Sequence, residues 1–177
     1  MKKAISRIAL VDEVLTRNQM FEIAIQVERD GAAFYEKAAD SDALCAVRVV
    51  LLELVEMEKE HEETFIELRQ GSLNPEEARR WNNPKSPAVE YMKSFSRGKV
   101  FDLTQDLCQY LTPGATREQL LRFAIDRELD TIAFFMGLMS TMSSSYGGSR
   151  KVEKIIKEEM EHVNLLVGDL TARAKKS

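Results

Sequence analysis

The chain contains few cysteines, prolines and glycines for its 177 residues, and each shortage excludes something. Its two cysteines, Cys45 and Cys108, lie far apart and belong to no C-x-x-C pair, so they build neither a zinc knuckle nor a rubredoxin-type iron site. We expect both to be small, partly buried hydrophobic residues. The prolines and glycines cluster at a few positions, which favours long uninterrupted helices between these breaks.

Long apolar runs and blocks of like charge are also missing. No run approaches the ~20 apolar residues that a membrane-spanning helix needs, and the N-terminus lacks the apolar stretch of a signal peptide. We therefore expect a cytoplasmic protein with no membrane partner. Acidic and basic residues are mixed, the net charge is −4 and no basic block stands out, so nucleic acid is not an expected partner either.

Four long stretches with helical periodicity lie between the breaks. Thr116 and Gln119 have capping-box spacing at the start of the third stretch, and Gly71 follows the second as a C-terminal stop. The length fits a single domain that covers residues 1–177. The sequence therefore predicts an all-α fold. Its helices are expected at about residues 17–39, 42–70, 116–143 and 149–174.

The link between the second and third helices, residues 72–115, is much longer than the other two connections. A long link lets the two helices that it joins run parallel, by crossing the bundle from end to end. Residues 88–95 and 100–111 are expected to form short helices within it, and Trp81 is expected to cover one end of the core. The sequence thus predicts a four-helix bundle with one long crossover link.

Each predicted helix has one apolar stripe, at steps of three and four residues, that is interrupted near its middle by glutamate. Two of the four stripes add a histidine three residues later, and these are the only two histidines in the chain. A buried carboxylate without a partner costs several kcal/mol, so four would rival a typical total stability of roughly 5–15 kcal/mol. Two divalent cations would neutralise four carboxylates. The predicted metal ligands are Glu28, Glu58, His61, Glu128, Glu159 and His162.

Carboxylate and imidazole ligands without thiolate suit iron or manganese, although zinc also binds such sets. The sequence therefore predicts two iron ions as the cofactor, with manganese and zinc as alternatives. Neighbouring acids lie off the apolar stripes, and we expect them to face solvent. They are Glu56, Glu60, Glu62, Glu63, Glu158 and Glu161.

An internal repeat connects the two halves of the chain. The segment Ile23–Tyr35 reads IAIQVERDGAAFY, and Phe123–Phe135 reads FAIDRELDTIAFF. A helix pair that is used twice predicts a pseudo-two-fold axis through the metal site, with one Glu and one Glu-x-x-His from each half. Tyr35 interrupts this symmetry, because its counterpart Phe135 has no hydroxyl. Tyr35 either fills the core or takes part in the chemistry beside the metals, and the sequence leaves both roles open.

The set of ligands resembles that of ferritin-like di-iron proteins, in which two helices give one Glu each and two give Glu-x-x-His. Within that superfamily the chain resembles the rubrerythrin type, and the resemblance covers the four long helices. The residues that carry it are Glu28-Arg29-Asp30-Gly31 with Phe34-Tyr35, Glu58-Lys59-Glu60-His61, Arg127-Glu128 with Phe134, and Glu159-Met160-Glu161-His162.

The resemblance implies a ferritin-like four-helix bundle and a non-haem di-iron oxidoreductase that reduces hydrogen peroxide or reacts with dioxygen. It also implies a homodimer. Full-length rubrerythrins carry a rubredoxin domain with no counterpart in this sequence, so a separate electron donor protein is expected. The implied roles are bridging ligands for Glu58 and Glu159, terminal ligands for Glu28 and Glu128, and one histidine on each metal, His61 and His162.

The chain departs from rubrerythrins at one point. Those proteins carry a further carboxylate one turn beyond a helix Glu ligand, and Gly31 and Thr131 occupy the candidate positions here. This departure weakens the peroxidase interpretation and leaves the metal site intact. Three alternatives therefore stay open: a ferroxidase or other iron-handling protein, a hydroxylase acting on a bound organic substrate, and a bundle that binds metal without turnover or binds none.

Overall fold

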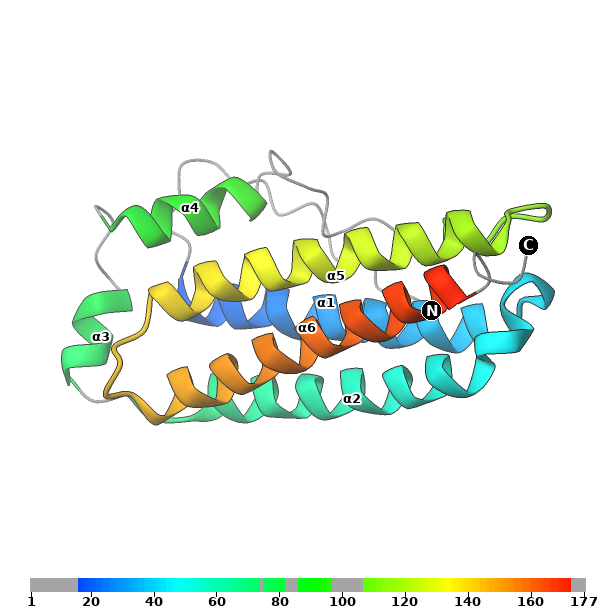
Figure 1. The fold of residues 1–177 in the computed structure, drawn as a ribbon. Helices are drawn as coiled ribbons and strands as arrows, with labels where there is room; N and C mark the ends of the chain where they lie inside the picture. Colours follow the sequence, from blue (N-terminus) through cyan, green and yellow to red (C-terminus); the bar gives the residue numbers. More distant parts are fainter. Residues whose placement is uncertain (1–15, 74, 82–85, 97–106, 173–177) are drawn as a thin grey trace, which may run out of the picture.

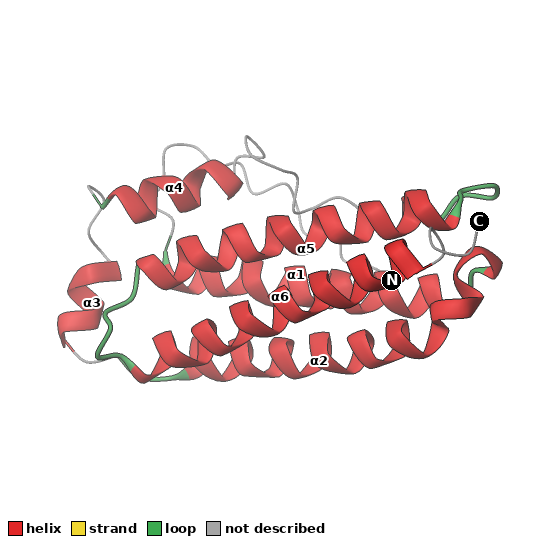
Figure 2. Cartoon of the chain, in the orientation of Figure 1, coloured by secondary structure: helices red, strands yellow, loops and turns green. Residues whose placement is uncertain are grey.

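The computed structural model describes residues 16–73, 75–81, 86–96 and 107–172 (Figure 1). Within these ranges the chain is all-helical and has no strand (Figure 2). The all-α prediction is therefore confirmed. The α-helices are α1 Arg17–Ala39, α2 Arg48–Gln70, α3 Pro75–Trp81, α4 Pro87–Ser96, α5 Arg117–Ser140 and α6 Gly147–Ala172, and two 3₁₀ helices are η1 Asp42–Val47 and η2 Leu107–Tyr110.

The four long helices form a bundle of two antiparallel pairs. Helix α1 packs along α2, and α5 packs along α6, while α1 also contacts α5 and α2 contacts α6. Helices α2 and α5 run in the same direction, and the segment between them carries α3 at one end of the bundle and α4 against α5 (Figure 1). The predicted parallel arrangement across a long link is confirmed.

Matching caps begin the first helix of each pair. The hydroxyl of Thr116 accepts a hydrogen bond from the Gln119 backbone, and the Gln119 side chain accepts one from the Thr116 backbone. This capping box confirms the prediction for α5. Thr16 and Gln19 form the same box at the start of α1, one hundred positions earlier, which was not predicted from the sequence. The internal repeat therefore includes the helix starts.

An arginine at each of these helix starts forms a hydrogen bond to the other helix of the same antiparallel pair. Arg17 donates to the backbone carbonyl of Arg69 over 2.9 Å, and Arg117 donates to that of Asp169 over 2.7 Å. Both acceptors belong to the last turns of the partner helices, α2 and α6, whose final carbonyls lack partners within the helix. Each arginine therefore fixes the register of one antiparallel pair.

Several predicted boundaries differ from the structure. The second stretch begins as the 3₁₀ helix η1, α5 ends at Ser140 and α6 starts at Gly147. Helix α3 was not predicted, because Pro75 was interpreted as a break, whereas proline is favoured in the first turn of a helix. The short helix expected at 88–95 is confirmed as α4. Of the segment 100–111, only residues 107–111 are described, and η2 lies there.

The core consists of two apolar clusters, one toward each end of the bundle, with the predicted polar residues between them. Trp81 is 2% exposed and its ring centroid lies 5.6 Å from that of Phe21, so it packs into the end of the core as expected. The first cluster includes Phe21, Phe65, Trp81, Phe135 and Ile155, and the second includes Tyr35, Leu51, Leu54, Leu121 and Leu166.

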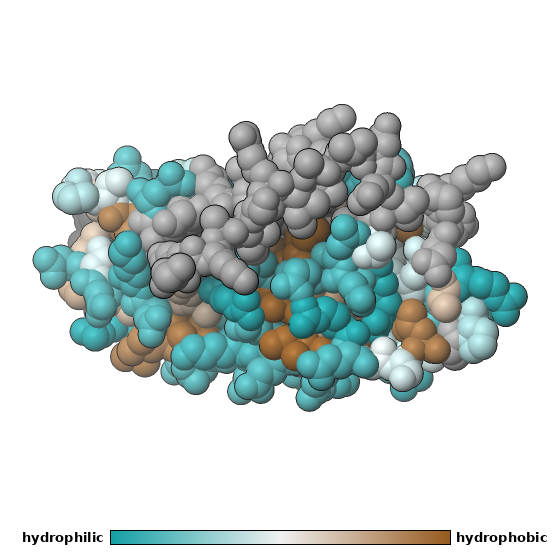
Figure 3. Space-filling model, turned by 180° about the vertical axis from the view of Figure 1, so that it is seen from behind, coloured by the Kyte–Doolittle hydropathy of each residue, from teal (hydrophilic) through white to brown (hydrophobic). Residues whose placement is uncertain are grey.

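Among the described residues, the exposed large apolar side chains are spread over several helices and include Val49, Tyr91, Leu129 and Met160. On the face shown in Figure 3, most of the described residues are hydrophilic and the hydrophobic ones lie in separate patches. Cys45 is exposed, which contradicts the expectation of partial burial, and it belongs to the short η1 at the edge of the bundle. The side chain of Cys108 lies outside the described residues. None of the described helices combines the length and the apolar character that crossing a membrane requires.

Candidate metal centre

All six predicted ligands meet in the middle of the bundle. Each of the four long helices delivers one glutamate there, and α2 and α6 each add a histidine three residues later on the same face. Every one of the six residues is at most 4% exposed. The stripes therefore place these groups together in the core, as the sequence predicted. The residues are Glu28, Glu58, His61, Glu128, Glu159 and His162.

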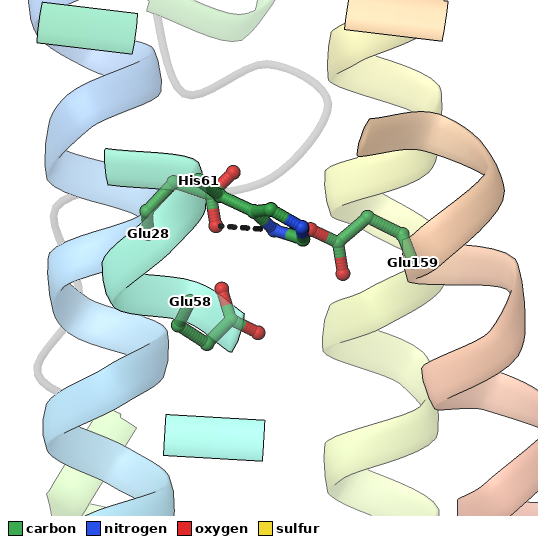
Figure 4. Close-up of side chains that lie close together, drawn as sticks. All are labelled: Glu28, Glu58, His61 and Glu159. Atoms are coloured by element: carbon green, nitrogen blue, oxygen red, sulfur yellow. Dashed lines mark ion pairs between the residues drawn. The ribbon is translucent and has the colours of Figure 1, made fainter. Parts of the chain in front are cut away.

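One group of potential ligands surrounds His61 (Figure 4). Its Nδ1 lies 2.9 Å from Glu159 Oε1 and 3.7 Å from Glu28 Oε2. One ligand atom from each of Glu28, Glu58, His61 and Glu159 can be chosen so that all four lie within 4.8 Å of one another. This spacing is compact enough for a single metal ion.

A second group surrounds His162. Its Nδ1 lies 2.8 Å from Glu159 Oε2, 3.5 Å from Glu58 Oε1 and 3.6 Å from Glu128 Oε1. The four residues Glu58, Glu128, Glu159 and His162 satisfy the same 4.8 Å criterion. Glu58 and Glu159 thus belong to both groups, whereas Glu28 and Glu128 each belong to one. The two imidazole rings stack with centroids 5.7 Å apart.

Many polar atoms of the cluster have no hydrogen-bond partner. The two imidazoles come close to Glu159, but several of these atoms are not in hydrogen-bonding geometry. Buried polar groups in native proteins are nearly always satisfied, and burying one without a partner costs free energy. The atoms without partners are both oxygens of Glu28 and Glu159, Nδ1 of His61 and both ring nitrogens of His162.

The protonation states of the carboxyl groups in the cluster also depend on whether a positive charge is present. Burial, and then the nearby charge of Glu58, raise the pKa of Glu28 well above its usual range. Burial, and then Glu159, do the same to the pKa of Glu128. The carboxyl groups of Glu28 and Glu128 therefore both retain a proton when no cation is bound.

The remaining charges are concentrated around Glu159. Burial alone would raise the pKa of Glu159, but the imidazoles of His162 and His61 outweigh it and lower that pKa to about 2. Burial opposes the charged form of His162, but its close polar contacts with Glu128, Glu159 and Glu58 outweigh burial and raise its pKa to about 12. The pKa of His61 is also raised, against burial, by Glu159 and Glu58. Protons on these groups supply the positive charge that cations would otherwise provide.

Tyr35 lies beside the cluster on α1. It is buried, and its hydroxyl donates a hydrogen bond to Glu128 Oε1. Burial, followed by the charge of Glu128, raises the pKa of Tyr35 well above its usual value, so the hydroxyl keeps its proton. The sequence left two roles open for Tyr35, one in the core and one beside the metals. Both remain open, because Tyr35 is buried in the core and also contacts a predicted ligand.

Two contacts beside the cluster were not predicted from the sequence. Glu158 was expected to face solvent, yet its Oε2 lies 3.4 Å from His61 Nε2 and its side chain is only 24% exposed. Gly31 lies so close to Glu58 that an added Cβ would meet the carboxylate carbon at 3.2 Å. Both contacts join residues of different helices, and no spacing along one helix indicates them.

The donor set fits metal ions. It offers carboxylate oxygens and imidazole nitrogens, no thiolate, and many atoms without another partner. The buried cluster can therefore hold metal ions, in two overlapping positions that share Glu58 and Glu159. Manganese, iron and zinc all accept such ligands.

Comparison with family models, curated proteins and solved structures finds no match to this chain. Its function therefore has to be inferred from the cluster itself.

Proposed function

We propose that the chain is a non-haem di-iron oxidoreductase of the rubrerythrin type, which reduces hydrogen peroxide or dioxygen. The observation that carries the proposal is the overlap of the two ligand groups, because two shared carboxylates are what a pair of adjacent metal ions requires. A single mononuclear site would not need the second histidine and the fourth glutamate at the same depth in the core.

The six residues divide into three roles under this proposal. Glu58 and Glu159, which belong to both groups, would be ligands of both ions. Glu28 with His61 completes one metal position, and Glu128 with His162 completes the other. When bound, an iron pair supplies two electrons, one from each ion, to the O–O bond of the oxidant. Manganese is the nearest alternative for this donor set.

The residues of the chain prepare the site for that chemistry in two ways. Their burial between two apolar clusters keeps bulk water away from the ions, and a low local dielectric strengthens each charge interaction. The Tyr35 hydroxyl holds a proton at Glu128 Oε1, within the cluster, where reduction of an oxidant consumes protons. Complete reduction of peroxide to two water molecules takes two electrons and two protons.

The electrons have to come from outside the bundle. We propose a separate electron donor protein, and a homodimer as the assembled form, on the resemblance to rubrerythrins. The ferritin-like version of the four-helix bundle is proposed on the same basis, supported by the parallel run of α2 and α5 across the long link.

The reaction is tested by stopped-flow mixing. Protein loaded anaerobically with ferrous ion is mixed with hydrogen peroxide, and the rate of iron oxidation is compared with that of the same concentration of free ferrous ion. The proposal predicts oxidation at least about tenfold faster in the protein, as expected for a preformed site with positioned groups. A rate no faster than that of free ferrous ion would exclude the oxidoreductase function.

A ferroxidase or other iron-handling role is the second candidate. Gly31 contacts the bridging Glu58, and Thr131 is its counterpart in the other half, so neither supplies the additional carboxylate of rubrerythrins. Preference for dioxygen over peroxide, with release of ferric ion after each turnover, would favour this role. Retention of ferric iron through repeated reduction would favour the oxidoreductase.

A further inference from the structure

The two histidines occupy equivalent positions in the repeat but have different surroundings at their outer nitrogens. His61 and His162 both turn Nδ1 toward the carboxylates of the cluster. The Nε2 of His61 lies 3.4 Å from Glu158 Oε2. The Nε2 of His162 is buried and has no hydrogen-bond partner. Counting along the repeat, the residue that corresponds to Glu158 is Met57, which has no carboxylate.

Glu158 reaches His61 across the boundary between the two halves. It belongs to α6, next to the ligand Glu159, whereas His61 belongs to α2. Its other oxygen, Oε1, accepts a hydrogen bond of 2.6 Å from Lys154. The lysine therefore holds the carboxylate from the solvent side while Oε2 faces the imidazole. A carboxylate behind a metal-binding histidine fixes the ring orientation, keeps the proton on the outer nitrogen and makes the inner nitrogen a stronger donor.

The carboxylates of Glu28 and Glu128 also differ in their hydrogen bonds, and this difference favours the same metal position as Glu158 does. Both oxygens of Glu28, on the His61 side, have no hydrogen-bond partner, although Oε2 lies 3.7 Å from His61 Nδ1. On the His162 side, Glu128 Oε1 already accepts a hydrogen bond from Tyr35, which withdraws negative charge from that oxygen. The His61 position therefore has the better oriented imidazole and the less engaged carboxylate.

We propose that Glu158 is a positioning residue that makes the two metal positions unequal, so that the first ion binds with Glu28 and His61 and the second with Glu128 and His162. This inference rests on the proposed metal centre, but it requires no turnover. It assigns a role to a residue outside the predicted ligand set.

Binding measurements with cobalt(II) test the proposal. The metal-free protein is titrated in competition with a chelator and followed by the visible absorption of the bound ion. Two affinities that differ by at least about tenfold are expected for the natural chain. Glu158→Gln should weaken the tighter step by about tenfold, within the range found when groups behind metal ligands are replaced. Glu161→Gln, an exposed change on the same helix, is the matched control and should leave both steps unchanged.

The variant Met57→Glu tests the same proposal by adding a carboxylate instead of removing one. Met57→Glu places a carboxylate at the repeat position that corresponds to Glu158, and it should strengthen the weaker step and bring the two affinities together. Melting temperatures of the metal-free variants show whether each one folds. If Met57→Glu does not fold, the comparison of Glu158→Gln with Glu161→Gln still decides the question.

Nuclear magnetic resonance identifies which position fills first. The chain has two histidines, so their ring nitrogens give separate signals that a His162→Gln variant assigns. One equivalent of zinc(II), a diamagnetic probe, should shift Nδ1 of His61, and the second equivalent should shift that of His162. Glu158→Gln should move the Nε2–H proton signal of His61 alone.

Two results would overturn the inference. Simultaneous shifts of both histidines with equal affinities would show that the positions are equivalent, and a Glu158→Gln variant that matches Glu161→Gln would show that the carboxylate has no positioning role. Either result leaves the proposed metal centre standing. A natural chain that binds neither cobalt nor zinc would overturn both the inference and the centre.

Discussion

At the residue scale, Gly31 lies on α1 beside the carboxylate of Glu58. An added Cβ would be 3.2 Å from both Cδ and Oε2 of that carboxylate, closer than ordinary van der Waals contact. The first prediction is that Gly31→Ala displaces Glu58 and weakens metal binding by about tenfold, a loss of about 1.4 kcal/mol. The affinity for cobalt(II) measures this effect.

Gly168→Ala is the matched control for that substitution. Gly168 is exposed on α6, and nothing lies within 4 Å of a Cβ added there. Alanine should therefore raise the free energy of unfolding by up to about 1 kcal/mol through its higher helix propensity, with metal binding unchanged. Equal metal affinity in the two alanine variants would contradict the close approach between Gly31 and Glu58.

Tyr35 gives a second prediction at this scale. Replacement by phenylalanine removes the hydroxyl that donates to Glu128 Oε1 and leaves that buried acceptor without this partner. The free energy of unfolding of the metal-free protein should fall by about 1–3 kcal/mol, the cost of an unsatisfied buried group. Urea unfolding in the presence of chelator measures it. The exposed Tyr110→Phe is the control, and a loss of the same size in both would contradict the role given to the hydroxyl.

At the element scale, the internal repeat includes the N-terminal caps of α1 and α5 as well as the predicted ligands. Thr16 and Thr116 cap α1 and α5 with the same pair of hydrogen bonds. The third prediction is that Thr16→Ala and Thr116→Ala each lower the free energy of unfolding by about 1 kcal/mol, as N-cap losses do. Thr171→Ala, near the exposed end of α6, should change it by less than about 0.5 kcal/mol. Chemical denaturation of the three variants tests this ranking.

The sequence predicted the long helices because their apolar residues repeat at steps of three and four, and that period alone determines the buried face. It predicted the six residues of the cluster because each one interrupts such a stripe. The period could not indicate α3, where Pro75 starts a helix, or η1, whose turn is tighter than that of an α-helix. The contacts of Glu158 with His61 and of Gly31 with Glu58 were not predicted, because they depend on how α6 meets α2 and how α1 meets α2.

At the scale of the whole molecule, the cluster links stability to pH. The pKa of His162 is raised to about 12, so the folded chain holds a proton that the unfolded chain loses above its ordinary pKa of 6.5. This contribution is complete below pH 6.5 and is lost as the pH rises toward 12. The raised pKa values of Glu28 and Glu128 act with the same sign, because the folded chain retains protons that the unfolded chain loses above pH 4.5.

The fourth prediction follows from these signs. The free energy of unfolding of the metal-free protein should decrease as the pH rises from about 5 to about 9. Glu159 acts in the opposite sense only below that range, since its pKa is lowered from 4.5 to about 2. Urea unfolding at a series of pH values with chelator present measures the trend. A free energy that stays constant or increases over this range would contradict the proton-filled cluster.

Metal binding should replace those protons. Because the ligands have to lose protons before they bind a cation, metal binding should release protons and become tighter as the pH rises. The pH change on adding zinc(II) to a weakly buffered, metal-free sample measures the release directly. Binding without any proton release would show that the carboxyl groups and imidazoles are already deprotonated in the metal-free chain.

The metal content of the purified protein decides whether the buried cluster is a metal centre. Elemental analysis of protein prepared without chelator is compared with Glu58→Ala and Glu159→Ala, the two residues shared by both ligand groups, and with the exposed Glu56→Ala as control. The account predicts about two iron or manganese ions per chain in the natural protein and the control, and loss of both ions in the two variants. No bound metal, and no uptake after anaerobic loading with ferrous ion, would contradict it.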